Sequence, residues 1–176
     1  MDGEGFEQDL DGERSHASDL LPCLAALLTS CGRTPRDIDA VAVGIGPGSY
    51  TGLRVGIATA QGIARAAGAE LLGIPSGEAL AHAEPSPGER GDLVVDARSG
   101  SLYHARFQRT ADGVKTLIAP RVVPADSLAE LLDDSSIVFL DEALESAARS
   151  REALRIIVGA APKARSLLEL AHPRLA

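Results

Sequence analysis

The stretch Val43-Gly44-Ile45-Gly46-Pro47-Gly48-Ser49-Tyr50-Thr51-Gly52-Leu53-Arg54 decides how the first half of the chain folds. It begins at the end of a short β-branched run, residues 38–45, which predicts a buried strand. It leads into an apolar pattern of helical period that predicts a helix from about Thr51 to Ala67. Three glycines around one proline lie between the two and predict a tight turn.

This turn has two interpretations. A strand end followed by a helix start exposes backbone N–H groups at a positive helix end, which suits a phosphate or a carboxylate. The stretch is neither a P-loop, because no Gly-Lys-Ser/Thr follows, nor the dinucleotide fingerprint, because the glycine spacing differs. Alternatively, the glycines only let strand and helix pack closely, and the residues alone support both interpretations equally. The candidate residues for a phosphate-type loop are Gly46, Gly48, Ser49, Thr51 and Arg54.

The predicted helix from Thr51 to Ala67 is rich in glycine and alanine. Such residues permit close helix–helix approach, here at the cost of helix propensity at three glycines. Core packing explains one face of the helix. A second small face, which we call the small face, has no evident partner within the chain and suggests a docking surface. It runs across Gly52, Val55, Thr59 and Gly62.

Around this stretch the first half alternates helices and short strands. The pattern predicts a helix from Ser15 to Cys31 closed by Gly32, a strand at residues 70–74, and a helix from Ser76 to about Ala83. Residues 6–10 show only a faint strand pattern, after a turn signal at residues 2–3. This order is typical of a layered α/β sheet.

The second half begins with three meandering strands. A hairpin is predicted at residues 93–97 and 102–107, and a third strand at residues 114–118. Helices at 128–132 and 142–151 then alternate with strands at 137–140 and 156–158, and Pro162 starts a last helix. This order is ribonuclease-H-like, and the first half resembles the same unit without its opening hairpin. We therefore predict a first lobe at 1–84, a linker at 85–91 and a second lobe at 92–176.

Composition excludes several classes of protein. The 176 residues carry a net charge of −8, and residues 1–14 contain six acids and one base, Arg14. The chain is therefore not expected to bind nucleic acid by itself, because such binding depends on positive charge that neutralises phosphates. No segment is apolar for the length of a membrane span. Cys23 and Cys31 are too far apart to bridge within one helix, which indicates a reducing, cytoplasmic setting.

The residues offer no self-contained catalytic or metal site. The four histidines lack ligand spacing, and no serine elbow or Cys/His pair supplies a nucleophile. Asp92 and Asp96 lie on one face of a strand. Asp96 could hold a metal or a sugar, although such an acid more often bonds to the following turn. We predict no catalytic residue and no metal ligand.

Four motifs together resemble one family: Ser15-His16 leading to Leu20-Leu21-Pro22, Gly44 through Gly56, Ile74-Pro75-Ser76-x-Glu78-Ala79-Leu80-Ala81, and Asp96-Ala97-Arg98-x-Gly100-x-x-Tyr103. The family is TsaB (YeaZ). The resemblance implies an actin-like ATPase fold of two ribonuclease-H-like lobes. The family begins with a strand carrying Asp-Thr or Asp-Ser, and this chain does not show one, so we expect an N-terminally incomplete first lobe and a recorded start that is too late.

The resemblance also implies a function. Family members are non-catalytic subunits of the machinery that makes threonylcarbamoyladenosine beside the tRNA anticodon. Their relative TsaD is the catalytic subunit that binds metal and nucleotide, the ATPase TsaE joins the complex, and tRNA is met through the complex. The resemblance thus implies no cofactor bound by this chain alone. The family has also been labelled a glycoprotease, but this sequence offers no nucleophile for such an activity.

The resemblance places the partner interface on the helices His16–Cys31 and Thr51–Ala67, which agrees with the small face. A second copy of the chain is another candidate partner for the same face. The alternative function is a stand-alone nucleotide- or phosphate-binding enzyme of actin-like fold. The expected interface residues are His16, Leu20, Thr51, Gly52, Val55, Gly56, Thr59 and Gly62.

Overall fold

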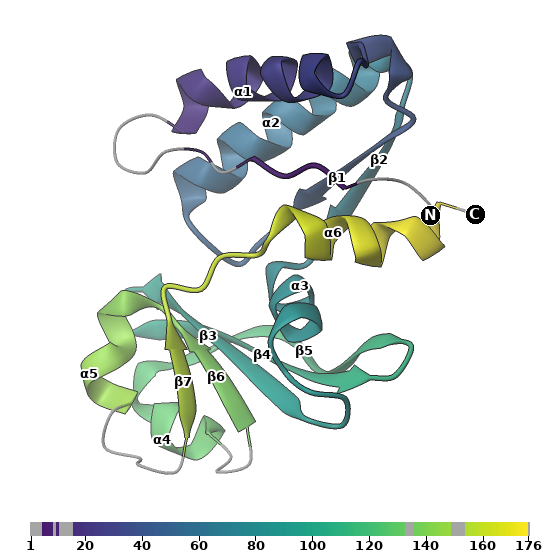
Figure 1. Cartoon of the computed structure of the whole chain (residues 1–176). Coiled ribbons are helices and arrows are strands. Elements are labelled where there is room, and N and C mark those ends of the chain that lie inside the picture. The colour runs from purple at the N-terminus through teal and green to yellow at the C-terminus, as the bar shows by residue number, and fades with distance from the viewer. Residues whose placement is uncertain (1–4, 9, 11–15, 133–135, 149–153, 176) are drawn as a thin grey trace. The chain divides into compact units, whose positions relative to one another are not determined.

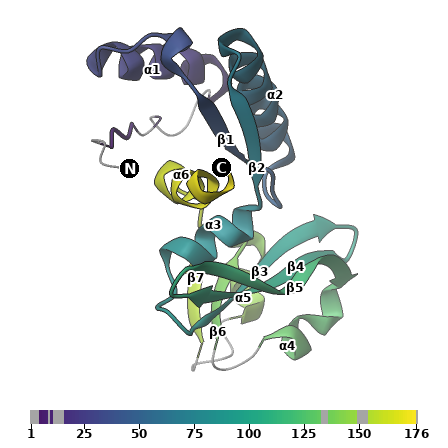
Figure 2. The same cartoon turned by 90° about the vertical axis from the view of Figure 1, so that its right-hand side faces the viewer.

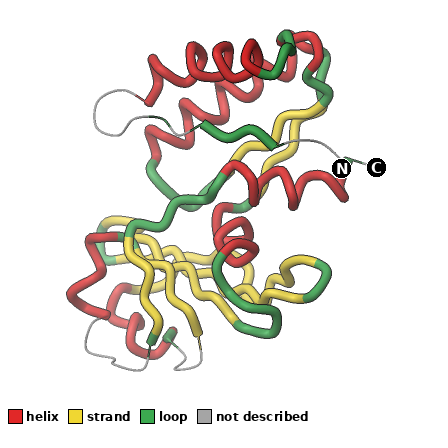
Figure 3. Tube along the Cα trace, viewed as in Figure 1, coloured by secondary structure: helices red, strands yellow, loops and turns green. Residues whose placement is uncertain are grey.

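The computed structural model describes residues 5–8, 10, 16–132, 136–148 and 154–175. The chain divides into two units, Met1–Ile74 together with Leu167–Ala176, and Pro75–Ser166. Figure 1 follows the chain by colour, and Figure 3 distinguishes helices, strands and loops. Both units combine helices with strands, which confirms the predicted α/β class.

The first unit is a β-α-β arrangement. Strands β1 (Ala40–Gly44) and β2 (Glu70–Ile74) pair in parallel, and helix α2 (Tyr50–Ala67) connects them and packs on β1. Helix α1 (His16–Ser30) packs on α2, as Figure 1 shows. Between α1 and β1 lies the short 3-10 helix η1 (Pro35–Asp37). Most of α6 (Ala164–Ala171) and the 3-10 helix η4 (His172–Arg174) belong to this unit as well.

Glycines end both long helices, at Gly32 as predicted and at Gly68. Gly32 follows α1 with φ +64°, and the Arg33 N–H donates to the Leu28 carbonyl over 2.8 Å. Gly68 follows α2 with φ +71°, and its N–H donates to the Ala64 carbonyl. These bonds satisfy carbonyls that a helix end leaves open, and a left-handed residue is required to form them.

Two expectations for the first unit are wrong. Strand β1 is half-buried along its length, not buried, because β2 is the strand it pairs with and α2 covers one face. The strand predicted across residues 6–10 is not formed, since residues 5–8 and 10 have no regular structure. The turn predicted at residues 2–3 lies outside the described residues.

The second unit contains a five-stranded mixed sheet. Its strands are β3 (Arg90–Arg98), β4 (Ser101–Thr110), β5 (Gly113–Pro124), β6 (Ser136–Leu140) and β7 (Arg155–Val158), in the spatial order β5-β4-β3-β6-β7. Strand β3 runs antiparallel to β4 and parallel to β6. This arrangement confirms the ribonuclease-H-like order. The helices are α3 (Ser76–Ala83), α4 (Leu128–Leu131) and α5 (Glu145–Ala148), with 3-10 turns η2 (Ala125–Ser127) and η3 (Glu142–Leu144).

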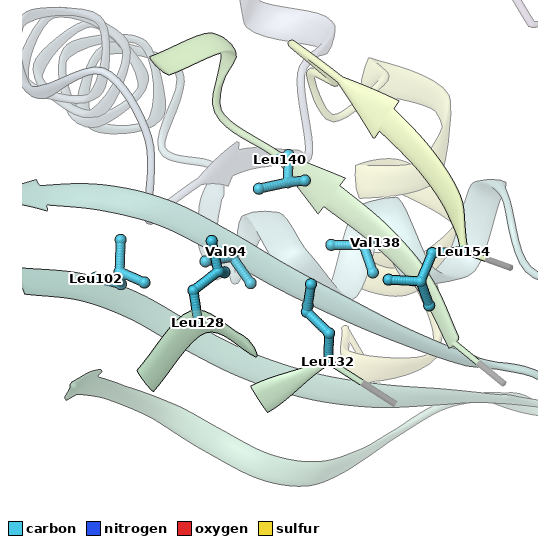
Figure 4. Packing of buried hydrophobic residues seen from close by; sticks show 7 residues of the cluster. All are labelled: Val94, Leu102, Leu128, Leu132, Val138, Leu140 and Leu154. Carbon is cyan, nitrogen blue, oxygen red and sulfur yellow. The ribbon is translucent and has the colours of Figure 1, made fainter. Parts of the chain in front are cut away.

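Each face of this sheet carries its own apolar cluster, because successive strand residues point to opposite faces. Helix α3 lies on one face and α4 on the other, as Figure 2 shows. The α3 cluster comprises Leu80, Ala81, Leu93, Ala105, Phe107, Ile137 and Phe139. The α4 cluster, drawn in Figure 4, comprises Val94, Leu102, Leu128, Leu132, Val138, Leu140 and Leu154.

The boundary between the units differs from the predicted linker at 85–91. Helix α3 belongs to the second unit, because it packs on β3, β4 and β5. Residues 167–176 belong to the first unit although they follow the second in sequence. Local composition marks a Pro- and Gly-rich segment, but packing decides which sheet a helix joins.

A titration tests the local structure before β1. The backbone N–H of Thr34 donates to Asp37 Oδ2 over 2.7 Å, and its hydroxyl donates to the same oxygen over 2.8 Å. The backbone bond first, and the hydroxyl bond second, hold the pKa of Asp37 below its ordinary value of 3.8. The stabilisation is complete above that value and is lost as pH falls through the folded-state pKa. We expect NMR titration to show this lowered pKa, and Thr34→Ala to raise it; an unchanged value would exclude the hydroxyl contribution.

Candidate functional site

The turn between β1 and α2 requires glycine at its first position. Gly46 has φ +91° and is followed by a cis bond to Pro47. A Cβ on Gly46 would lie 2.9 Å from Leu53 Cδ1, the end of a side chain on α2, so the positive φ is the stronger reason for glycine here. Close packing of strand and helix does not require glycine at position 48, where a Cβ would meet nothing within 4 Å.

Two polar residues of the predicted phosphate-type loop, Ser49 and Arg54, have partners within the chain. Ser49 caps α2, since its Oγ accepts from the Gly52 N–H over 3.3 Å. The Arg54 guanidinium lies over the Tyr50 ring, 5.4 Å from its centroid. Gly48 and Thr51 are exposed. Anion binding at this loop therefore stays a prediction, with Ser49 and Arg54 already engaged.

Two glycines of the expected interface on α2 are open: Gly62, which belongs to the small face, and Gly56. A Cβ on Gly56 or on Gly62 would meet nothing within 4 Å. On Gly52 it would meet only the Ser49 side chain, at 3.5 Å, which is ordinary contact. Packing of α1 on α2 therefore does not require glycine at positions 56 and 62. Glycine at these two positions indicates a surface that a partner outside the chain can approach closely.

The other expected interface residues lie on the same two helices. Thr51 is exposed, and Leu20, Val55 and Thr59 are half-buried. His16 begins α1, and its side chain lies outside the described part of the chain. Whether this set meets a partner stays a prediction.

Helices α1 and α2 also carry exposed apolar side chains. Leu21 on α1 is 55% exposed and Tyr50 on α2 is 73% exposed. Helix α2 contains two arginines and no acid over its 18 residues, within a chain of net charge −8. Helix α2 is thus weakly positive, whereas α1 contains one acid, Asp19, and no lysine or arginine.

A buried polar cluster in the second unit escaped the sequence analysis. Asp92 is fully buried, and its Oδ1 is bonded to His104 Nε2 at 2.8 Å and accepts from Arg106 Nε at 2.7 Å. Arg106 Nη2 also donates to the Leu131 carbonyl at the end of α4, at 2.7 Å. Asp92 Oδ2 and His104 Nδ1 are buried without a hydrogen-bond partner in the described structure. The cluster ties the sheet to α4.

Hairpin register could have revealed this cluster. With the turn at residues 98–100, Asp92 falls directly opposite Arg106, and His104 lies opposite Val94, on the same face as Arg106. Counting outward from the predicted turn would have paired the acid with the base. Counting positions along the hairpin would not have shown that the pair is buried.

Asp96 has the turn role that the sequence favoured. Its Oδ1 accepts from the Arg98 N–H over 2.8 Å, in a turn where Arg98 and Ser99 have φ +67° and +52°. Among the described residues, no three His, Cys, Asp or Glu side chains gather as a metal site requires. No helix in the described ranges has both the length and the apolar content to cross a membrane.

The mixed sheet of the second unit and the β-α-β arrangement of the first define an α/β protein of the actin-like ATPase class. The family model for TsaD, tRNA N6-adenosine threonylcarbamoyltransferase, matches residues 11–162. The chain belongs to this family, and within it to the TsaB (YeaZ) branch.

Relatives and solved structures agree with this assignment. The chain is 37% identical over 103 residues to the tRNA threonylcarbamoyladenosine biosynthesis protein TsaB of Escherichia coli, covering 57% of this chain and 45% of that protein. It is 30% identical over 135 residues to TsaB of Bacillus subtilis, covering 73% and 57%. The structure matches YeaZ from Pseudomonas aeruginosa with a TM-score of 0.74 and 28% identity, covering 91% of this chain and 77% of that one. The chain spans about half the length of these curated relatives.

Proposed function

We propose that this chain is a non-catalytic partner subunit of the machinery that makes N6-threonylcarbamoyladenosine in tRNA, and that it supports a TsaD-type catalytic subunit. Two curated relatives are named tRNA threonylcarbamoyladenosine biosynthesis protein TsaB. The observation that carries the proposal is the open surface of α2 at Gly62 of the small face and at the expected interface residue Gly56, where a Cβ would meet nothing within 4 Å. A partner helix can approach closely there, which is the geometry of a docking surface.

The same proposal covers the other components. ATP and metal belong to the TsaD-type subunit, a TsaE-type ATPase joins through the complex, and tRNA is contacted through the complex. A second copy of this chain competes for the same face when the catalytic subunit is absent. The site of action is the cytoplasm.

Gly56→Arg tests the interface. We expect it to weaken binding of the TsaD-type subunit at least about tenfold, because a long charged side chain would enter the close approach, and tenfold corresponds to about 1.4 kcal/mol. A Cβ at this position meets nothing within 4 Å, so α2 should still form, which the helix content checks. Binding is measured by calorimetry, and the helix content by circular dichroism.

Gln61→Arg is the matched control. Gln61 is exposed, is not an expected interface residue, and lies five residues along α2 from Gly56, therefore about 140° around the helix from it. It adds the same charge and the same side chain to another face, so binding should be retained. An equal loss of binding affinity in both variants would mean that the added charge alone is responsible. Normal binding by Gly56→Arg would contradict the proposed interface.

A stand-alone nucleotide- or phosphate-binding enzyme is the second candidate. It is favoured by the N-terminus of α2 at the glycine loop, and disfavoured by the engagement of Ser49 with the cap and of Arg54 with Tyr50. Titration of the isolated chain with ATP and with inorganic phosphate discriminates the two functions. Micromolar binding of either would favour the enzyme.

A further inference from the structure

The buried cluster of Asp92, His104 and Arg106 is only partly satisfied by hydrogen bonds. Asp92 Oδ1 is bonded to His104 Nε2 at 2.8 Å and to Arg106 Nε at 2.7 Å. In the described structure, Asp92 Oδ2 and His104 Nδ1 are buried without a partner, although the two side chains are 0% and 1% exposed. A buried polar network with unpartnered atoms gives less net stability than apolar side chains of similar size would give. The cluster is therefore better suited to a role other than stability.

The apolar residues around the cluster do not by themselves fix which way β3 faces. Successive strand residues point to opposite faces of a sheet, so a shift of one residue in strand pairing exchanges the two faces. On β3, Leu93 belongs to the α3 cluster and Val94 to the α4 cluster, and Val95 packs against the α3 cluster. On β6, residues 137–140 are all buried and apolar, and they alternate between the two clusters. A shift by one residue would thus exchange apolar side chains for other apolar side chains.

Strand β4 is not held in a regular ladder on either side. Its pairing with β3 shifts between Asp96 and Arg98, next to a turn in which residues 98–100 have φ of +67°, +52° and +74°. Its pairing with β5 shifts twice within residues 104–107. The register of a hairpin is ordinarily set by a regular turn and by the apolar pattern. Here both leave room for another register.

We propose that the cluster selects the pairing register of β3 and β4 and adds no net stability to the second unit. Asp92 lies directly opposite Arg106 in this pairing, and Arg106 Nη2 also donates to the Leu131 carbonyl of α4 over 2.7 Å. A shift of β4 by one residue would turn Arg106 and His104 to the face that α3 covers, away from Asp92 and from α4. It would leave a buried acid and a buried base without partners, which is strongly unfavourable. The cluster thus excludes a pairing that the apolar residues would permit.

Apolar replacement of the whole cluster in the full chain tests this role. Two triple variants are made, so that a packing fault in one does not decide the result: Asp92→Val with His104→Leu and Arg106→Met, and Asp92→Leu with His104→Met and Arg106→Leu. We expect at least one to unfold cooperatively in urea, with a midpoint at or above that of the original chain. Its β3 and β4 amides should give at least two sets of NMR signals, with populations within about tenfold of each other. The original chain should give one set.

Val138→Ala is the control, because it removes apolar volume from the α4 cluster and leaves the polar cluster in place. It should lower the urea midpoint and keep one set of signals, which separates loss of register from loss of stability. One set of signals in every folded triple variant, with Leu93 still opposite Ala105 as in the original pairing, would overturn the proposal. Failure of both triple variants to fold, or midpoints below that of the original chain, would overturn it as well, since the cluster would then be needed for stability.

Discussion

Replacing Asp92 with alanine is expected to destabilise the second unit by about 3–5 kcal/mol. The substitution removes the carboxylate that bonds to both His104 and Arg106 at 2.8 and 2.7 Å. The Arg106 side chain is only 16% exposed and would keep its charge without a counter-charge. An uncompensated buried charge costs far more than the net gain of the intact pair. The free energy of unfolding should fall accordingly.

Urea unfolding of the second unit measures this effect. The chain has two tyrosines and no tryptophan, so in a Tyr50→Phe background Tyr103 on β4 alone reports this unit. Glu84→Ala is the control, because its ion pair with Arg155 spans 3.5 Å with side chains 34% and 59% exposed, and such pairs contribute at most about 1 kcal/mol. Equal losses in the two variants would show that the buried cluster contributes no more than a surface pair.

Replacing Gly77 with alanine is expected to destabilise the same unit by about 1–3 kcal/mol. Gly77 lies in the first turn of α3, where alanine would ordinarily favour the helix by up to about 1 kcal/mol. Here a Cβ would lie 2.9 Å from Phe107 Cζ, nearer still to Cε2, and 3.0 Å from Leu93 Cδ2. The overlap with the ring and the strand side chain outweighs the gain in propensity, because both neighbours are held in the core.

The second-site variant Phe107→Leu tests the cause. If the collision with the ring is responsible, the double variant should lose less than the sum of the two single losses. Gly62→Ala is the control, since its Cβ meets nothing within 4 Å and alanine should raise the helical stability of α2 by about 0.5–1 kcal/mol. Additive losses in the double variant would mean that the ring is not what excludes a side chain at Gly77.

Much of the fold could be predicted from local patterns. The strand at residues 70–74 and the helix from Ser76 to Ala83 have the predicted bounds, and the hairpin turns at residues 98–100. Glycine after α1 and after α2 ends each helix where the periodicity ends. These features depend on neighbours within a few residues, where backbone sterics and hydrophobic period act directly.

The two helices on which the interface is expected, α1 and α2, were likewise predictable, but the surroundings of their residues were not. The small face of α2 follows from helical spacing alone. That Gly56 and Gly62 face open space, while Gly77 is pressed against a ring, could be learned only from what packs beside them. A glycine has the same local propensity in all three places.

By itself, then, the sequence determined the elements, their order and the family, because each depends on patterns carried by contiguous residues. The tertiary structure decided which sheet α3 joins, the half-burial of β1 and the burial of Asp92 with His104 and Arg106. These depend on how many strands and helices cover a given face. Burial is a property of residues distant in the chain, and a charged residue looks like a surface residue until its neighbours across the sheet are in place.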